Sequence, residues 1–166
     1  MKNTIKFLLL FGICTASHCG KREDTENCHR AIKFYNDTEK SLYARCTHQC
    51  HLYTDPFDIN YLSYTVEAPV WYKVNSGEEN RKASQIDYGC IESDFKGDYY
   101  GDTLWYFVFD AAVVENTPWE VVARDYLVLK RYDLTLEDLR QLDWKITYPP
   151  TETMKDVKQY PPYGSE

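Results

Sequence analysis

The order of hydrophobic and polar residues divides the chain into an apolar start, a short charged segment and a long region of brief alternating stretches. Residues 31–35 alternate between apolar and polar side chains, which predicts a strand. A polar turn at 36–40 then predicts that 42–45 returns beside it as the second strand of a hairpin. Residues 104–109 are apolar throughout, which predicts a central strand that is buried on both faces.

Two capping signals in the last third of the chain predict short helices. Thr117 followed by Pro118 and Glu120 suits an N-cap, a first helical position and a capping box, so a helix is expected over 118–124. Thr135 and Asp138 indicate the start of a second helix, with Leu136 and Leu139 facing inward. Further strands are predicted at 61–66, 70–74, 86–91, 126–131 and 145–148, with an exposed loop at 76–84. The predicted fold class is therefore a β-rich α+β protein, an antiparallel sheet or sandwich with two short C-terminal helices.

Residues 1–18 have the pattern of an export signal. Lys2 and Lys6 precede an apolar run over 7–14, and small and polar residues follow it. The run is too short to span a bilayer as a mature helix. The working protein is therefore expected outside the cytoplasm.

The end of this signal has two interpretations. Ala16-Ser17-His18-Cys19 resembles a bacterial lipobox, although Ala16 and His18 stand where lipoboxes usually carry Leu and Gly or Ala. The resemblance implies that Cys19 is lipidated and holds the protein at the outer membrane or cell surface. Cleavage near Ala16 and Ser17 is the alternative, and it produces a soluble secreted or periplasmic protein with five cysteines. Lipidation leaves an even set of four, which suits an oxidising compartment and favours the first interpretation.

The mature chain is expected to have three parts. Residues 19–27 form the lipidated cysteine and a charged, flexible tether, 28–150 a globular domain, and 151–166 an extended tail rich in proline and tyrosine that straps the domain. Removing residues 1–18 removes two lysines and no acid, which leaves 17 basic and 26 acidic residues and a formal charge of −9. This charge argues against a nucleic-acid partner.

Several stretches of the C-terminal third resemble a group of small lipoproteins from Bacteroidetes-type gut bacteria. They are Glu115–Trp119, Leu129–Leu139, Thr147–Pro150, Met154–Asp156 and Tyr160–Tyr163, and the start at Cys28-His29 belongs to the same likeness. The resemblance implies an exported, membrane-anchored protein. It implies no activity, because none is assigned to the group.

Four cysteines beyond Cys19 allow three pairings. Cys46 and Cys50 depart from the pattern of the similar lipoproteins, which favours a local bridge between them and a long-range Cys28–Cys90 bridge. If the predicted hairpin places Cys28 level with Cys50, the alternative is Cys28–Cys50 with Cys46–Cys90. The run from Cys46 to His51 also resembles a rare spacing of the covalent haem-attachment motif and contains ligands suited to zinc. Disulfide pairing is the preferred interpretation in an exported protein, so neither a metal nor a cofactor is expected.

Two weaker signals lie between residues 92 and 104. Glu92, Asp94, Asp98 and Asp102 form an acidic stretch, but Lys96 falls where a calcium-binding loop requires a ligand, so a solvated loop is expected. Asp102-Thr103-Leu104 resembles the three-residue O-glycosylation site of Bacteroidetes-type exported proteins, which implies a glycan on Thr103.

Composition and motifs favour a binding protein over an enzyme. The chain is 16% aromatic with 15 tyrosines, which suits half-buried strands and equally a sugar-binding surface. It contains no nucleophile elbow, zinc-protease motif or phosphate-binding glycine loop. The expected function is a surface binding or accessory module for a glycan or another outer-membrane protein. The alternative is a glycosidase-like hydrolase that uses paired acids such as Asp110 and Glu115.

Overall fold

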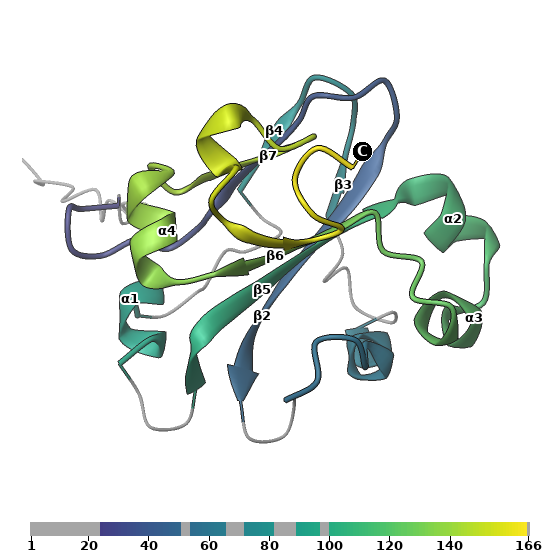
Figure 1. Cartoon of the computed structure of the whole chain (residues 1–166), viewed down its shortest axis with the longest axis horizontal. Coiled ribbons are helices and arrows are strands. Elements are labelled where there is room, and N and C mark those ends of the chain that lie inside the picture. The colour runs from purple at the N-terminus through teal and green to yellow at the C-terminus, as the bar shows by residue number, and fades with distance from the viewer. Residues whose placement is uncertain (1–23, 51–53, 66–71, 82–88, 97–99, 166) are drawn as a thin grey trace, which may run out of the picture.

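The computed structural model describes residues 24–165 except 51–53, 66–71, 82–88 and 97–99, and it contains two sheets and four short α-helices (Figure 1). The strands are β1 (Lys33–Asn36), β2 (Leu42–Cys50), β3 (Tyr72–Val74), β4 (Glu79–Asn80), β5 (Tyr100–Asp110), β6 (Lys130–Leu134), β7 (Lys145–Tyr148) and β8 (Lys158–Tyr160). The helices are α1 (Ile91–Asp94), α2 (Ala111–Asn116), α3 (Trp119–Arg124) and α4 (Leu136–Gln141), with 3-10 turns η1 (Asn60–Thr65) and η3 (Glu152–Met154). The predicted fold class, a strand-rich α+β protein, is confirmed.

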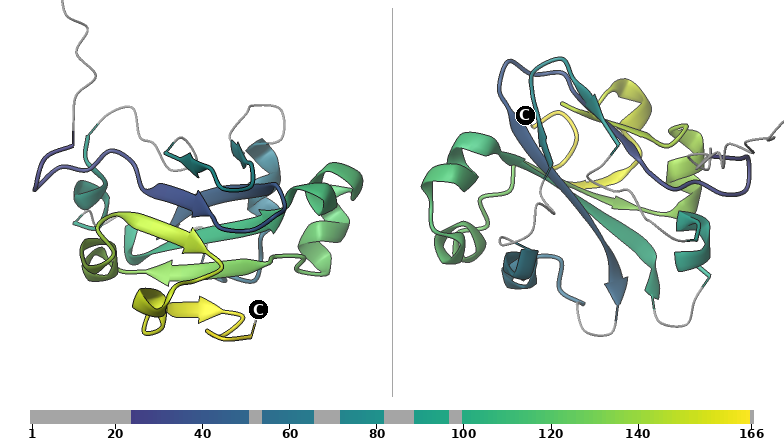
Figure 2. Two further views of the ribbon diagram at one scale, coloured as in Figure 1. Left: turned by 90° about the horizontal axis from the view of Figure 1, so that it is seen from above. Right: turned by 180° about the vertical axis from the view of Figure 1, so that it is seen from behind.

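The larger sheet is antiparallel, with strand order β3-β2-β5-β6-β8, and the smaller one has the order β4-β1-β7. Within the smaller sheet β1 pairs with β4 antiparallel and with β7 parallel. Figure 2 shows the same arrangement from above and from behind. Both cores of the domain lie against the larger sheet.

Strand β5 supplies side chains to both cores, because successive residues of a strand point to opposite faces. Leu104, Tyr106 and Val108 join a core that includes residues of β1, β7 and the α4 region. Trp105, Phe107 and Phe109 join a second core with η1 and α3. Residues 104–109 are all at most 2% exposed, which confirms the prediction of a doubly buried central strand.

The predicted hairpin of 31–35 with 42–45 is wrong, because β1 and β2 belong to different sheets. The fully buried Asn36 sits at the point where the chain leaves β1. Its amide donates to the carbonyls of Lys40 (2.7 Å) and Val74 (3.0 Å), and its side-chain oxygen accepts from Thr38. These bonds stabilise the turn through which the chain passes from the smaller sheet to the larger one. In sequence this turn resembles a hairpin loop.

Three other strand predictions also need correction. Residues 60–65 form η1 and not a strand, and Ile91 begins α1, while residues 86–88 lie outside the described part. The predicted strand at 126–131 begins only at Lys130, because Tyr126 takes a left-handed φ of 48° directly after α3. Apolar alternation over a few residues does not distinguish a strand from a helical turn.

The helix predictions succeed where a capping box is present. Thr135 caps α4, with Asp138 bonding back to the Thr135 backbone as expected, and Leu139 is fully buried. Helix α3 lies where predicted, but its N-cap is Pro118 and no side chain caps it, so the predicted role of Thr117 is wrong. Helix α2 was not predicted. Its N-cap Asp110 accepts a hydrogen bond from the amide of Ala112.

The segment after Pro150 is built into the domain and not merely laid over it. Met154 and Val157 are buried in the first core, and β8 extends the larger sheet by pairing with β6. The buried Lys130 ammonium donates to the carbonyls of Pro161 (2.8 Å) and Pro162 (3.4 Å). The predicted boundary at residue 150 therefore does not separate a tail from the folded domain.

Candidate functional site

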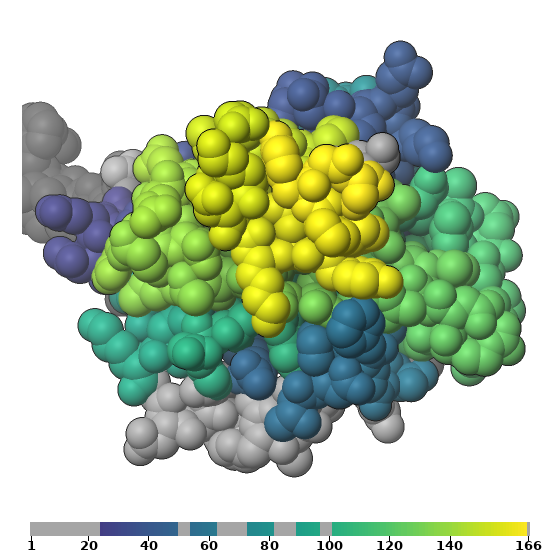
Figure 3. Space-filling view, in the orientation of Figure 1, coloured from purple at the N-terminus to yellow at the C-terminus, as the bar shows by residue number. Residues whose placement is uncertain are grey.

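Three aromatic rings from distant parts of the chain meet on one face of the domain. Phe57, Tyr126 and Tyr160 lie with ring centroids 5.0 Å (Phe57–Tyr126), 5.1 Å (Phe57–Tyr160) and 5.6 Å (Tyr126–Tyr160) apart. Phe57 is 47% exposed and Tyr160 is 40% exposed. We call these three residues the three-ring platform. Figure 3 shows the C-terminal segment, in yellow, meeting the segment before and within η1, in blue, on this face.

A buried arginine holds the platform from below. The Arg131 guanidinium carbon lies 4.6 Å from the ring centroid of Phe57 and 5.8 Å from that of Tyr160, so it makes cation–π contacts with both. Arg131 Nη1 donates to the Tyr126 hydroxyl (3.0 Å) and to the Pro56 carbonyl (3.1 Å), and the Tyr126 hydroxyl donates to the same carbonyl (3.2 Å). Burial raises the pKa of the Tyr126 hydroxyl, and Arg131 partly offsets this rise. These contacts fix the positions of the rings and of the loop beside them.

The charge of Arg131 is balanced within the fold. Arg131 Nε lies 2.6 Å from an Asp133 oxygen, and both side chains are almost completely buried. Lys158 Nζ, on an exposed side chain, lies 3.1 Å from the other Asp133 oxygen. The strand register pairs Arg131 with Tyr160 and Asp133 with Lys158. One face of the sheet therefore carries Arg131, Asp133 and Lys158.

Two exposed carboxylates flank Phe57 in its loop. Asp55 Oδ1 accepts from the amide of Phe57 (2.9 Å), and Asp58 Oδ1 accepts from the amide (3.2 Å) and side chain (2.8 Å) of Asn60. These bonds shape the loop at Pro56 and Phe57. They leave acceptor capacity on both carboxylates, because a carboxylate can accept several hydrogen bonds.

Sequence reasoning missed this platform. Tyr160 lies in the predicted tail, Tyr126 at the start of a predicted strand and Phe57 in no predicted element. A local signal exists, since Pro56-Phe57 and Tyr160-Pro161 each join an aromatic residue to a proline. Nothing in the sequence indicates that residues 57, 126 and 160 meet.

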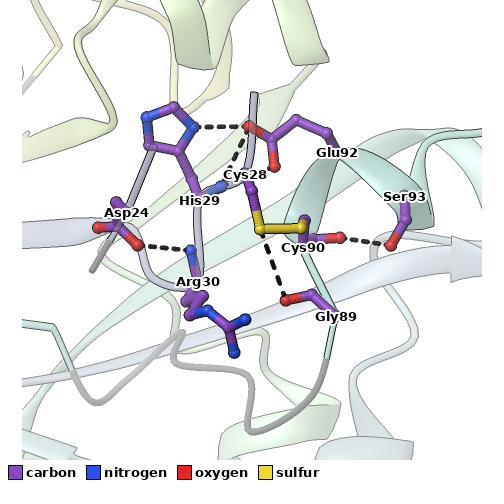
Figure 4. Close-up of a disulfide and its surroundings, with 8 residues drawn as sticks. All are labelled: Asp24, Cys28, His29, Arg30, Gly89, Cys90, Glu92 and Ser93. Carbon is purple, nitrogen blue, oxygen red and sulfur yellow. Dashed lines mark hydrogen bonds and ion pairs between the residues drawn. A yellow bond between two sulfur atoms is a disulfide. The ribbon is translucent and has the colours of Figure 1, made fainter. Parts of the chain in front are cut away.

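The disulfide between Cys28 and Cys90 is present, which confirms that pairing and excludes Cys28–Cys50 with Cys46–Cys90 (Figure 4). Beside it, the Glu92 carboxylate accepts from the backbone amide (2.9 Å) and pairs with Nδ1 (2.6 Å) of His29. The His29 ring stacks on Trp144 at 3.9 Å. Burial acts to raise the pKa of Glu92, but the His29 hydrogen bonds outweigh it and hold the pKa below its usual value. This cluster clamps the start of the domain to α1.

The segment from Cys46 to Cys50 is part of β2, and His51 lies outside the described residues. Four residues of an extended strand span about 13 Å, whereas a disulfide requires Cα atoms within about 7 Å. The expected Cys46–Cys50 bridge is therefore wrong for this strand. Burial raises the pKa of the Cys46 thiol to about 11 and lowers that of His48 to about 4, so both groups are neutral near pH 7.

The acidic stretch is not one solvated loop. Glu92 is buried against His29, and an Asp94 oxygen lies 3.5 Å from His48 Nε2, where burial raises the pKa of Asp94. Asp98 lies outside the described residues, and Asp102 accepts from the Thr103 hydroxyl (2.9 Å). Within the described ranges, no group of three or more His, Cys, Asp or Glu side chains is arranged to hold a metal ion. Glycosylation of Thr103 stays a prediction.

The acids considered for a hydrolase are both paired with lysines. Asp110 lies 3.1 Å from Lys40 and caps α2, and Glu115 lies 2.8 Å from Lys73 and accepts from the Tyr43 hydroxyl (3.1 Å). Burial acts to raise the pKa of Asp110, but Lys40 and the helix amides outweigh it, so the pKa is lowered. The hydrogen bonds from Lys73 and Tyr43 lower the pKa of Glu115. A glycosidase acid needs the opposite shift.

No family model, curated protein or solved structure matches the chain. In the described part of the chain, no helix is both long and apolar enough to cross a membrane. Cys19 lies before the described residues.

Proposed function

We propose that this protein is an exported, lipid-anchored binding module and that the three-ring platform is its binding surface. The observation that carries the proposal is an exposed group of aromatic rings that is held by buried polar contacts. Rings that only fill space do not need the support that Arg131 gives by two cation–π contacts and two hydrogen bonds. A surface ordered in advance loses less conformational entropy when it binds a ligand.

The position of the exposed apolar side chains supports the same conclusion. The large hydrophobic residues that are most exposed among the described ones are Phe57, Leu127, Tyr160 and Tyr163. Two of them, Phe57 and Tyr160, are in ring contact and so form one exposed apolar patch. Exposed apolar patches are found at ligand-binding sites and protein interfaces.

The Cys28–Cys90 disulfide supports export, because such bonds persist in oxidising compartments. The charged segment after Cys19 suits a tether that lets the domain stand away from a membrane. The hydrolase alternative has less support, since Asp110 and Glu115 form ion pairs with lysines and have lowered pKa values.

Binding at the platform is tested by substituting its two most exposed rings. Phe57→Ala with Tyr160→Ala is expected to abolish retention of the partner, whether a glycan on an array or a purified outer-membrane protein first found by pull-down. Tyr35→Ala is the matched control, because Tyr35 also has a cation, Lys145, 4.9 Å from its ring centroid but lies on β1 in the other sheet. Equal retention by the platform variant and the control contradicts the proposal.

The lipid anchor is tested by fractionation of cells that express the whole chain. The wild type is expected in the detergent-rich membrane phase, since an acyl anchor there buries its methylene groups. Cys19→Ser is expected to release the protein or to leave its signal uncleaved. A fully soluble wild type with an alkylatable Cys19 contradicts the anchor and leaves a secreted protein.

A further inference from the structure

Resting on the proposed function, we propose that the ligand of the three-ring platform is a neutral carbohydrate. Three properties of the surface select this class: its size, its charges and the polar groups at its edge. Each is taken from the described residues.

The exposed apolar surface is too small for a stable contact with a folded protein. Its exposed rings are Phe57, which is 47% exposed, and Tyr160, which is 40% exposed. Since an aromatic side chain presents roughly 200 Å² when fully accessible, these two rings expose less than about 200 Å². A stable protein interface takes about 800 Å² from each partner, and more than half of that area is apolar. A patch of this size fits a few sugar rings.

The charges near the platform disfavour ions of either sign. Among the described residues, Arg131 is the cation in contact with Phe57 and Tyr160, and it is buried and paired with Asp133, so it is not available to an anionic ligand. Asp55 and Asp58 stand on either side of Phe57 and repel anions. The exposed Lys158 adds a positive charge two residues from Tyr160 and on the same face of the sheet, so accessible charges of both signs lie around the rings. Charge complementarity therefore favours an uncharged ligand.

The mixed chemistry of the surface separates a sugar from a lipid or an apolar peptide. A sugar ring has C–H faces that lie well on aromatic rings and hydroxyls that need hydrogen-bond partners. Phe57 and Tyr160 provide the apolar area, and the carboxylates of Asp55 and Asp58 provide acceptors at its rim. Binding sites for small molecules have this composition of aromatic side chains with a few placed polar groups.

The test measures binding of the processed chain to soluble polysaccharides by affinity electrophoresis and calorimetry. Neutral probes are mannan, xylan and mixed-linkage β-glucan, with polygalacturonate as the anionic probe and chitosan as the cationic one. At least one neutral probe is expected to bind, at least about tenfold more tightly than either charged probe. Phe57→Ala with Tyr160→Ala is expected to lose about tenfold or more in affinity, the size of a lost aromatic contact. Tyr35→Ala is expected to bind as the wild type does.

A second variant tests the charge argument. Asp55→Asn with Asp58→Asn removes both negative charges and keeps side-chain oxygens that can cap the loop. The ratio of the affinity for the neutral probe to the affinity for polygalacturonate is therefore expected to fall. Tighter binding of a charged probe by the wild type, or unchanged binding by the ring variant, overturns the carbohydrate proposal. If no polysaccharide binds while a purified envelope protein is retained through the platform rings, the ligand class is wrong and the binding function stands. If neither is retained, both proposals fail.

Discussion

Loss of the Cys28–Cys90 disulfide is expected to lower the free energy of unfolding by about 4 kcal/mol. The bond joins residues 62 positions apart and so removes much of the freedom of the unfolded chain. The cost also includes local contacts, because the Glu92 carboxylate depends on the His29 amide and ring that the bond holds nearby. A loss of this size is a large part of the stability of a typical domain.

The measurement is urea unfolding of the wild type and of Cys28→Ser with Cys90→Ser, each with and without a reductant. The reductant is expected to lower the unfolding midpoint of the wild type to that of the double variant and to leave the variant unchanged. A wild type that is indifferent to reductant, or a variant that loses less than about 1 kcal/mol, contradicts the assignment of the bond as the main covalent support of the N-terminal segment.

Arg131→Met is expected to destabilise the domain by about 3–5 kcal/mol, because it leaves the Asp133 carboxylate buried without its closest partner. The variant also removes the donor to Pro56 and the cation beneath Phe57. The platform is therefore expected to loosen together with the loss of stability. Thermal unfolding followed by circular dichroism measures the first effect.

Two companion variants separate the buried ion pair from its surroundings. Arg131→Met with Asp133→Leu removes both charges and is expected to regain most of the lost stability, since two apolar side chains replace a pair that is costly to desolvate. Lys158→Met removes the exposed partner of Asp133 and is expected to have a small effect, as surface ion pairs do. If Arg131→Met and Lys158→Met unfold at the same temperature, the buried Arg131–Asp133 pair does not stabilise the domain more than the exposed Lys158–Asp133 pair does.

The elements predicted correctly are those with a complete local signal. Residues 104–109 are apolar without interruption, which is typical of a strand buried on both faces, and all six are buried. Helix α4 has its capping box and its inward leucines within seven residues, and β7 occupies the predicted residues 145–148. In each case the information lies inside the segment that it describes.

The predictions that failed needed information from elsewhere in the chain. The 31–45 region has the turn and the alternation of a hairpin, but β1 pairs in parallel with β7, which lies more than 100 residues later in the chain. The side-chain amide of Asn36 donates to the carbonyls of Lys40 and Val74 where the chain leaves β1. Cys46 and Cys50 were expected to pair because both depart from the pattern of the lipoproteins that the chain resembles, yet an extended strand holds them too far apart. Short patterns of this kind fit several structures until packing selects one.

The candidate site depends on tertiary contacts more than any other feature of the protein. The acidic and aromatic composition, the strand-rich class and the central strand are predicted from the sequence alone, because each follows from residue type or local periodicity. Only the tertiary structure brought Phe57, Tyr126 and Tyr160 together over Arg131. Their segments meet because β8 pairs with β6 at the sheet edge and the Pro56 carbonyl accepts from two distant side chains, and such long-range contacts leave no periodic trace in the chain.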